Sequence, residues 1–169
     1  MASTYHNGKS KSSGCVQTAQ HNDTIRSMEL KYAAGTIVAA QTSDGPALLC
    51  LLDDVHAEDQ FVQAALIHKK VTLATQHDAI VTAETTGLEE AAVIQAGVVG
   101  PLAVTAVEEV LGCIDKVTLQ AVANMEMDVA GVKVGQPLSD AQDMRWEFKN
   151  LEVDRLHNIC RQGINSVLG

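Results

Sequence analysis

The sequence is poor in aromatic residues, which make up 3% of its 169 positions. They are Tyr5, Tyr32, Phe61, Trp146 and Phe148. Proteins that bind single-stranded nucleic acid stack bases on aromatic side chains, so this composition argues against that class. The net charge of −9 argues against it as well, because contacts to phosphates depend on Lys and Arg. We therefore expect no nucleic acid partner.

Closely spaced cysteines and long apolar runs are also absent. Cys15, Cys50, Cys113 and Cys160 lie 35 or more residues apart, without a C-x-x-C pair. This spacing indicates neither a zinc knuckle nor a redox motif and predicts free thiols. No run of about 18 uncharged apolar residues occurs, and residues 1–30 contain no apolar signal-peptide core. We expect synthesis in a cytoplasm and no membrane partner.

The first 30 residues are rich in Ser, Thr, Asn, Gln and Lys and have no hydrophobic period. Segments of this composition do not bury enough apolar surface to fold alone. We predict a flexible N-terminal arm over residues 1–30 that becomes ordered on a partner.

From residue 31 onward, short apolar runs with β-branched residues alternate with turn residues. Such runs predict strands, and they lie at 35–40, 47–52, 61–68, 69–75 and 79–84. We predict a mainly β (α+β) fold, with a small antiparallel β-barrel or β-tulip-like body and short packed helices.

The remainder of the chain is predicted to mix helices and strands. A cap at Thr85 or Thr86 and the acidic pair Glu89-Glu90 favour a helix over 85–99, and Pro101 favours another that ends at Gly112. Residues 115–135 alternate like strands, a helix is favoured from about 154, and 140–153 fit either pattern. We predict a β-rich core at 31–100 and a C-terminal extension or subdomain at 101–169.

An acidic turn between two apolar runs is the first candidate site. It contains Asp53, Asp54, His56, Glu58 and Asp59. Carboxylates on a loop suit a hard cation, but the spacing and central glycine of an EF-hand loop are missing. We interpret the turn as the solvated end of a hairpin.

Other reactive side chains do not form a recognisable set. His68 ends an apolar run and fits a hydrogen-bonded structural histidine, and Cys50 lies within the run ALLCLL, where burial suppresses thiol reactivity. Glu89 and Glu90 are neighbours whose carboxylates diverge on a helix. No G-x-S-x-G elbow or glycine-rich phosphate loop is present. We predict no catalytic, cofactor-binding or metal-binding residues, and no cofactor.

Residues 35–100 resemble the head decoration, or capsid cement, proteins of tailed bacteriophages, of the lambda-type trimeric family. The segments that carry the resemblance are GTIVAA (35–40), LLDDVHA (51–57), KKVTLA (69–74) and TTGLEEAAVIQAG (85–97). The chain departs from the family pattern at Leu49, where a glycine is usual, and at Lys69-Lys70, where Arg-Gly is usual.

The resemblance implies a structural virion protein that is not an enzyme. It implies a homotrimer on the exterior of an icosahedral capsid, with the arm adding a strand to the major capsid protein. The arm residues expected to bind the capsid are Lys9, Lys11, Ile25, Arg26, Met28 and Leu30. The alternatives are a small cytosolic enzyme or ligand-binding β-barrel that uses His56 or His68 with the 53–59 turn, and a fibre or tail component.

Overall fold

The computed structural model describes residues 29–169. Their strands are β1 (Leu30–Tyr32), β2 (Thr36–Thr42), β3 (Gly45–Leu51), β4 (Val55–His56), β5 (Phe61–His68), β6 (Asp78–Val81), β7 (Ala92–Ala103), β8 (Val107–Cys113) and β9 (Lys133–Val134). The helices are α1 (Ala83–Thr86), α2 (Lys116–Asn124) and α3 (Arg145–Leu168), with 3-10 turns η1 (Val71–Leu73) and η2 (Val104–Ala106). The prediction of a mainly β, α+β fold is confirmed.

Seven strands form one antiparallel sheet in the order β8-β2-β3-β5-β7-β6-β9, and β1 pairs with β4 separately. Within the described residues β8 and β9 are the two edges of the larger sheet, which therefore does not close into the barrel that we predicted. The β2–β3 hairpin turns at Gly45, whose φ of 106° lies in the region that glycine adopts most easily.

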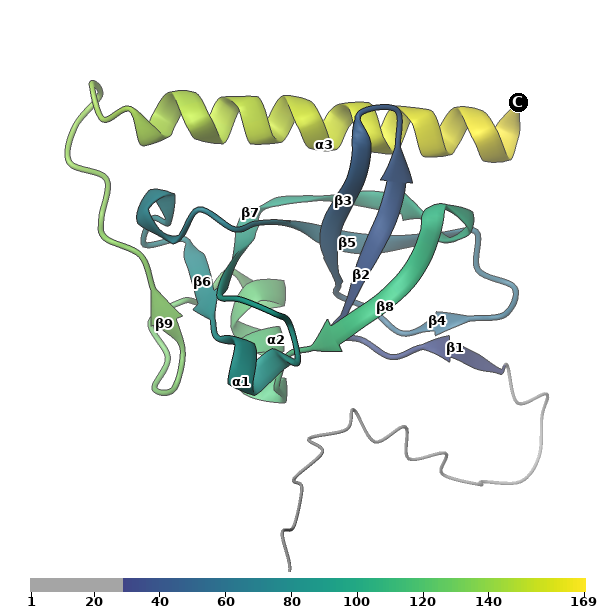
Figure 1. Cartoon of the computed structure of the whole chain (residues 1–169), viewed down its shortest axis with the longest axis horizontal. Helices are drawn as coiled ribbons and strands as arrows, with labels where there is room; N and C mark the ends of the chain where they lie inside the picture. The colour runs from purple at the N-terminus through teal and green to yellow at the C-terminus, as the bar shows by residue number, and fades with distance from the viewer. Residues whose placement is uncertain (1–28) are drawn as a thin grey trace, which may run out of the picture.

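A hydrophobic cluster lies on each face of the sheet. One cluster joins buried strand residues such as Leu49 and Leu66 to Leu156 and Ile159 of α3. The other joins strand residues such as Ile67 to Val122 of α2. Figure 1 accordingly shows α3 running along one side of the sheet, with α2 on the opposite side.

Three kinds of contact hold α3 against the sheet. At its start, Arg145 donates hydrogen bonds to the carbonyl oxygens of Ala74, Gln136 and Pro137. Further along, the Gln162 amide donates to the Ser43 hydroxyl at the tip of the β2–β3 hairpin, at 2.7 Å. Directly after Gln162 the helix backbone lies so close to β7 that a Cβ added at Gly163 would lie 2.9 Å from the Cβ of Ala103.

Several predicted elements are wrong. The helix predicted over 85–99 is only the single turn of α1, which is capped by the Thr82 hydroxyl and ends at Gly87, and most of the remaining segment is strand β7. The helix predicted from Pro101 to Gly112 consists of the end of β7, η2 and β8. Residues 115–135, predicted as strands, contain α2, whose first turn is capped by Asp115.

The C-terminal helix begins at Arg145, so the open segment 140–153 is largely helical. The predicted arm lies outside the described residues up to Met28, and Leu30 belongs to β1, where it pairs with His56. The division into a core at 31–100 and an extension at 101–169 stays a prediction.

Candidate functional site

His68, the last residue of β5, is a buried histidine with one unused nitrogen. Its side chain is 7% exposed, and its Nδ1 accepts a hydrogen bond from the Lys70 backbone N–H at 3.1 Å. A neutral imidazole that accepts at Nδ1 carries its proton on Nε2. That Nε2–H has no hydrogen-bond partner among residues 29–169. An unpaired buried donor destabilises a protein by about 1–3 kcal/mol. The Nε2 atom of His68 is therefore a candidate for contact with a ligand.

The surroundings of His68 keep it neutral. Burial is the largest cause, and it lowers the pKa of His68 to about 4. The positive charges of Lys149, Lys70 and Arg155 lower the pKa further, while the carboxylate of Asp78 opposes them. At neutral pH the side chain is therefore an uncharged hydrogen-bond donor.

His68 lines a cavity of about 430 Å³ between the sheet and α3. The sheet supplies an apolar wall from Pro46, Leu48 and Ile67. The helix supplies Phe148, Glu152 and Arg155, and the segment after β5 supplies Lys69 and Lys70. We call this space the His68 cavity. Ligand sites in proteins commonly have volumes of about 300–1,000 Å³, so its size suits a small ligand or part of a larger one.

Phe148 organises the rim of this cavity. Its ring meets the His68 ring edge-on, with centroids 4.9 Å apart and an interplanar angle of 84°. The Lys70 ammonium lies 5.5 Å from the centre of the same ring, which is within the range of a cation–π contact. Phe148 thus holds both the imidazole and a positive charge beside the cavity.

A chain of buried polar side chains lies behind the cavity, between α3 and the sheet. Lys149 forms an ion pair with Asp78, which is fully buried on β6 and also accepts hydrogen bonds from the backbone N–H and hydroxyl of Thr75. The Gln95 amide on β7 donates to a Glu152 carboxylate oxygen at 2.8 Å. The second Glu152 oxygen lies 3.8 Å from an Arg155 nitrogen. This network fixes the position of Glu152 at the cavity.

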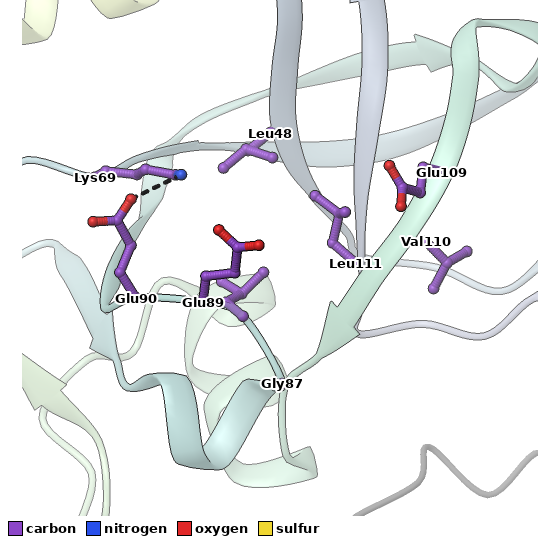
Figure 2. A pocket seen from close by; sticks show the side chains of 9 residues that line it. Leu48, Lys69, Gly87, Glu89, Glu90, Glu109, Val110 and Leu111 are labelled. Atoms are coloured by element: carbon purple, nitrogen blue, oxygen red, sulfur yellow. Dashed lines mark ion pairs between the residues drawn. The ribbon is translucent and has the colours of Figure 1, made fainter.

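A second cavity of about 360 Å³ lies next to the first. It is lined by Leu48, Lys69, Gly87, Leu88, Glu89, Glu90, Glu109, Val110 and Leu111, and we call it the Glu109 cavity. Figure 2 shows the Lys69–Glu90 ion pair at one end of it, the Glu89 carboxylate beside that pair, and the Glu109 carboxylate beyond Leu111 on β8. The nitrogen–oxygen distance of that pair is 2.8 Å.

The acidic turn that we considered first has a structural role in two of its residues. The Asp54 carboxylate accepts a hydrogen bond from the Ala34 backbone N–H at 2.8 Å, and Asp59 accepts one from the His56 backbone N–H at 2.7 Å. No group of three or more metal-ligating side chains occurs within residues 29–169. The turn and His68 lie at opposite ends of β5, roughly 23 Å apart along the strand, so the structure does not bring them together.

The remaining candidates from the sequence are the cysteines and the six arm residues. Cys50 and Cys160 are free and buried, as predicted, and burial raises the pKa of the Cys50 thiol to about 12. The prediction of a free thiol is wrong for Cys113, which is disulfide-bonded. Of the six arm residues expected to bind a capsid, five lie outside the described residues, and Leu30 is partly exposed on β1.

Sequence reasoning gave His68 a structural role, or in the alternative a ligand-binding role together with the 53–59 turn, and it did not find the residues that surround the cavity. Gln95 and Lys149 are 54 residues apart and meet only through the packing of α3 on β7. One signal was available in the sequence: Gln95 interrupts the apolar run AAVIQAGVV. A polar residue inside an apolar run, once buried, requires a hydrogen-bonding partner.

Comparison with known proteins identifies no family for this chain. No family model matches it, and no curated protein matches it. Among the solved structures that resemble it is the Mycobacterium tuberculosis toxin MazF-mt6, at 19% sequence identity and a TM-score of 0.44. The likeness covers 53% of this chain and 90% of the toxin. At that TM-score the match assigns no activity to this chain.

These findings correct the sequence-based identification. The resemblance to phage head decoration proteins is wrong, because no family model and no curated protein supports it. The capsid-stabilising function, the virion keywords and the prediction that the chain is not an enzyme all rested on that resemblance, and they are withdrawn with it. The predicted partners and location stay untested. None of the helices within residues 29–169 is long and apolar enough to span a bilayer.

Proposed function

We propose that the His68 cavity binds the anionic group of a ligand, a carboxylate or a phosphate. The observation that carries this proposal is the buried Nε2–H of His68, which has no partner among the described residues. A carboxylate or phosphate oxygen would accept this hydrogen bond and remove the cost of the unpaired donor. The proposal belongs to the alternative in which the chain is a small ligand-binding or enzymatic β protein.

The charges around the cavity favour an anion. Lys70 and Arg155 both line it, and only Arg155 has a nearby carboxylate, at 3.8 Å. Arg presents a planar fork of donors that suits carboxylate and phosphate groups. The Nε2 atom is itself buried, so a ligand that reaches it must displace a side chain of the rim, and Lys70 and Arg155 are the long, flexible ones.

Binding of an anion would also change the chemistry of His68. A negative charge beside an imidazole favours its protonated form, so the pKa of His68 would rise from about 4 toward neutral. Imidazoles with a pKa near the working pH act as general acids and bases. The bound ligand would thus place a proton donor next to its own anionic group.

The proposal is tested by NMR titration of the isotopically labelled protein with inorganic phosphate and with acetate. We expect saturable, millimolar binding and a rise in the pKa of His68 as either anion is added. Arg155→Gln should weaken binding, whereas His157→Ala, which changes an exposed residue of the same helix, should not. The proposal is rejected if neither anion shifts the His68 signals saturably in the wild-type protein.

A further inference from the structure

The two cavities form one groove. Leu48 of β3 and Lys69, directly after β5, line both the His68 cavity and the Glu109 cavity. The pairing register places Glu109, Ala39, Leu48 and Ile67 opposite one another across strands β8, β2, β3 and β5. Adjacent strands lie about 4.8 Å apart, so the groove spans roughly 14 Å from β8 to β5.

The ends of this groove carry opposite charges. At the β8 end, Glu109 has no ion pair with any residue in the range 29–169, and Glu89, which lies nearer to Lys69, forms none either. At the β5 end are Lys70, Arg155 and the unpaired donor of His68. Between them lies a surface of Leu48, Leu88 and Leu111, which are partly buried. A ligand that matches the groove is positive at one end, apolar in the middle and negative at the other.

The β8 end is accessible from outside. β8 pairs only with β2 among the described strands, and Val110, which lines the Glu109 cavity, is 52% exposed. A chain that enters the groove can therefore continue past this edge of the sheet. The site need not enclose a whole molecule.

We infer that the groove binds an extended peptide segment, with a Lys or Arg side chain between Glu89 and Glu109 and a carboxylate in the His68 cavity. The inference rests on the proposed function for the anionic end. An extended chain advances about 3.3 Å per residue, so roughly four residues span the groove. A nucleic acid strand fits less well, because its successive phosphates would meet the two unpaired glutamates.

The experiment compares three acetylated tetrapeptides by NMR titration of the full chain. The first is acetyl-Lys-Ala-Val-Ala with a free C-terminus, the second has Gln in place of Lys, and the third has the Lys sequence with an amidated C-terminus. We expect the Gln peptide to bind up to about fivefold more weakly than the first, the range of an exposed ion pair. The amidated peptide should lose more affinity, because it lacks the carboxylate.

A matched pair of variants locates the cationic end. Glu109→Gln should weaken binding of the Lys peptide and leave the affinity of the Gln peptide unchanged. Glu108→Gln removes the same charge from the neighbouring residue of β8, which is exposed and does not line the cavity. This control should change the affinities of the Lys peptide and the Gln peptide by the same small factor. An equal loss with Glu108→Gln and Glu109→Gln would overturn the inference.

The outcomes separate the inference from the proposed function. If the free-acid peptides bind equally well with Lys and with Gln, and the amidated peptide binds poorly, the inference is wrong and the proposed function stands. If amidation changes nothing, the proposed function fails. If a short single-stranded oligonucleotide binds more tightly than the Lys peptide, nucleic acid replaces the peptide as the occupant and the inference is wrong.

Discussion

The ion pair between Lys149 and Asp78 offers the sharpest test of how α3 is held on the sheet. Asp78 is fully buried on β6, and the Lys149 ammonium is the charged partner that the structure provides. Lys149→Met removes that charge while keeping an unbranched side chain of similar length. The Asp78 carboxylate then remains buried with only the hydrogen bonds from Thr75.

Removal of one member of a buried ion pair costs about 3–5 kcal/mol, because the other charge is left uncompensated. Domains of this size have a total free energy of unfolding of about 5–15 kcal/mol, so the loss is a large fraction. Adding Asp78→Asn removes the stranded charge, and the carbonyl oxygen of Asn can still accept from the Thr75 N–H. We expect the double variant to recover about half or more of the loss.

Urea denaturation measures both effects, with the midpoint reporting stability at constant m-value. Lys133→Met is the matched control, since Lys133 is exposed on β9, and we expect a change within about 0.5 kcal/mol. A cost for Lys149→Met below about 1 kcal/mol, or a double variant less stable than Lys149→Met alone, would refute the reasoning.

Three further predictions concern single residues. The pKa of His68 is about 4 in the folded protein against 6.5 for an unperturbed histidine, so the unfolded chain binds more protons between these values and stability falls as pH drops from 6.5 to 4. The loss is about 3 kcal/mol, and urea titrations of His68→Phe should lack it; an unchanged pH slope would contradict the prediction. Gly112→Ala should destabilise by about 1–3 kcal/mol or more, because the new Cβ would lie 2.2 Å from the Thr86 carbonyl oxygen, whereas Gly97→Ala meets nothing within 4 Å; equal melting temperatures for the two variants would exclude this cause. The Cys50 thiol, with its pKa raised to about 12 by burial, should resist alkylation at pH 8 until the protein is unfolded, and rapid labelling of the native protein would contradict its burial.

Where the sequence predicted strands correctly, local patterns agreed with the final packing. The run at 61–68 is β5 at the same bounds, and the run at 35–40 lies within one or two residues of β2. Both are rich in apolar residues that are buried in the sheet, so local preference and burial favour the same conformation.

Elsewhere the tertiary structure overrode the local pattern. In 85–99 the threonines and glutamates do start a helix, but Gly87 ends it in the left-handed region with φ of 84°. The following apolar residues become a strand because β5 and β6 pair with both edges of β7. In α2 the alternation of Val117 and Leu119 resembles a strand, while the Asp115 cap and the buried positions Thr118, Ala121 and Val122 follow a helical period.

The candidate site was largely beyond sequence reasoning because its residues come from distant parts of the chain. His68 was identified as a residue at a strand end, but its burial depends on Phe148 of α3, 80 residues later. The Gln95–Glu152 hydrogen bond joins residues 57 positions apart. A single sequence contains no local signal for such contacts, so the unpaired nitrogen of His68 becomes visible only in three dimensions.

The position of α3 at the C-terminal side of all nine described strands has a consequence for biosynthesis. Ribosomes add residues in order from the N-terminus, so His68 and the sheet wall are made well before Phe148, Glu152 and Arg155. In a nascent chain that ends before residue 145, Asp78 has no Lys149 and the cavity has no helical side. The cavity that we propose as a ligand site is therefore complete only late in the synthesis of the chain.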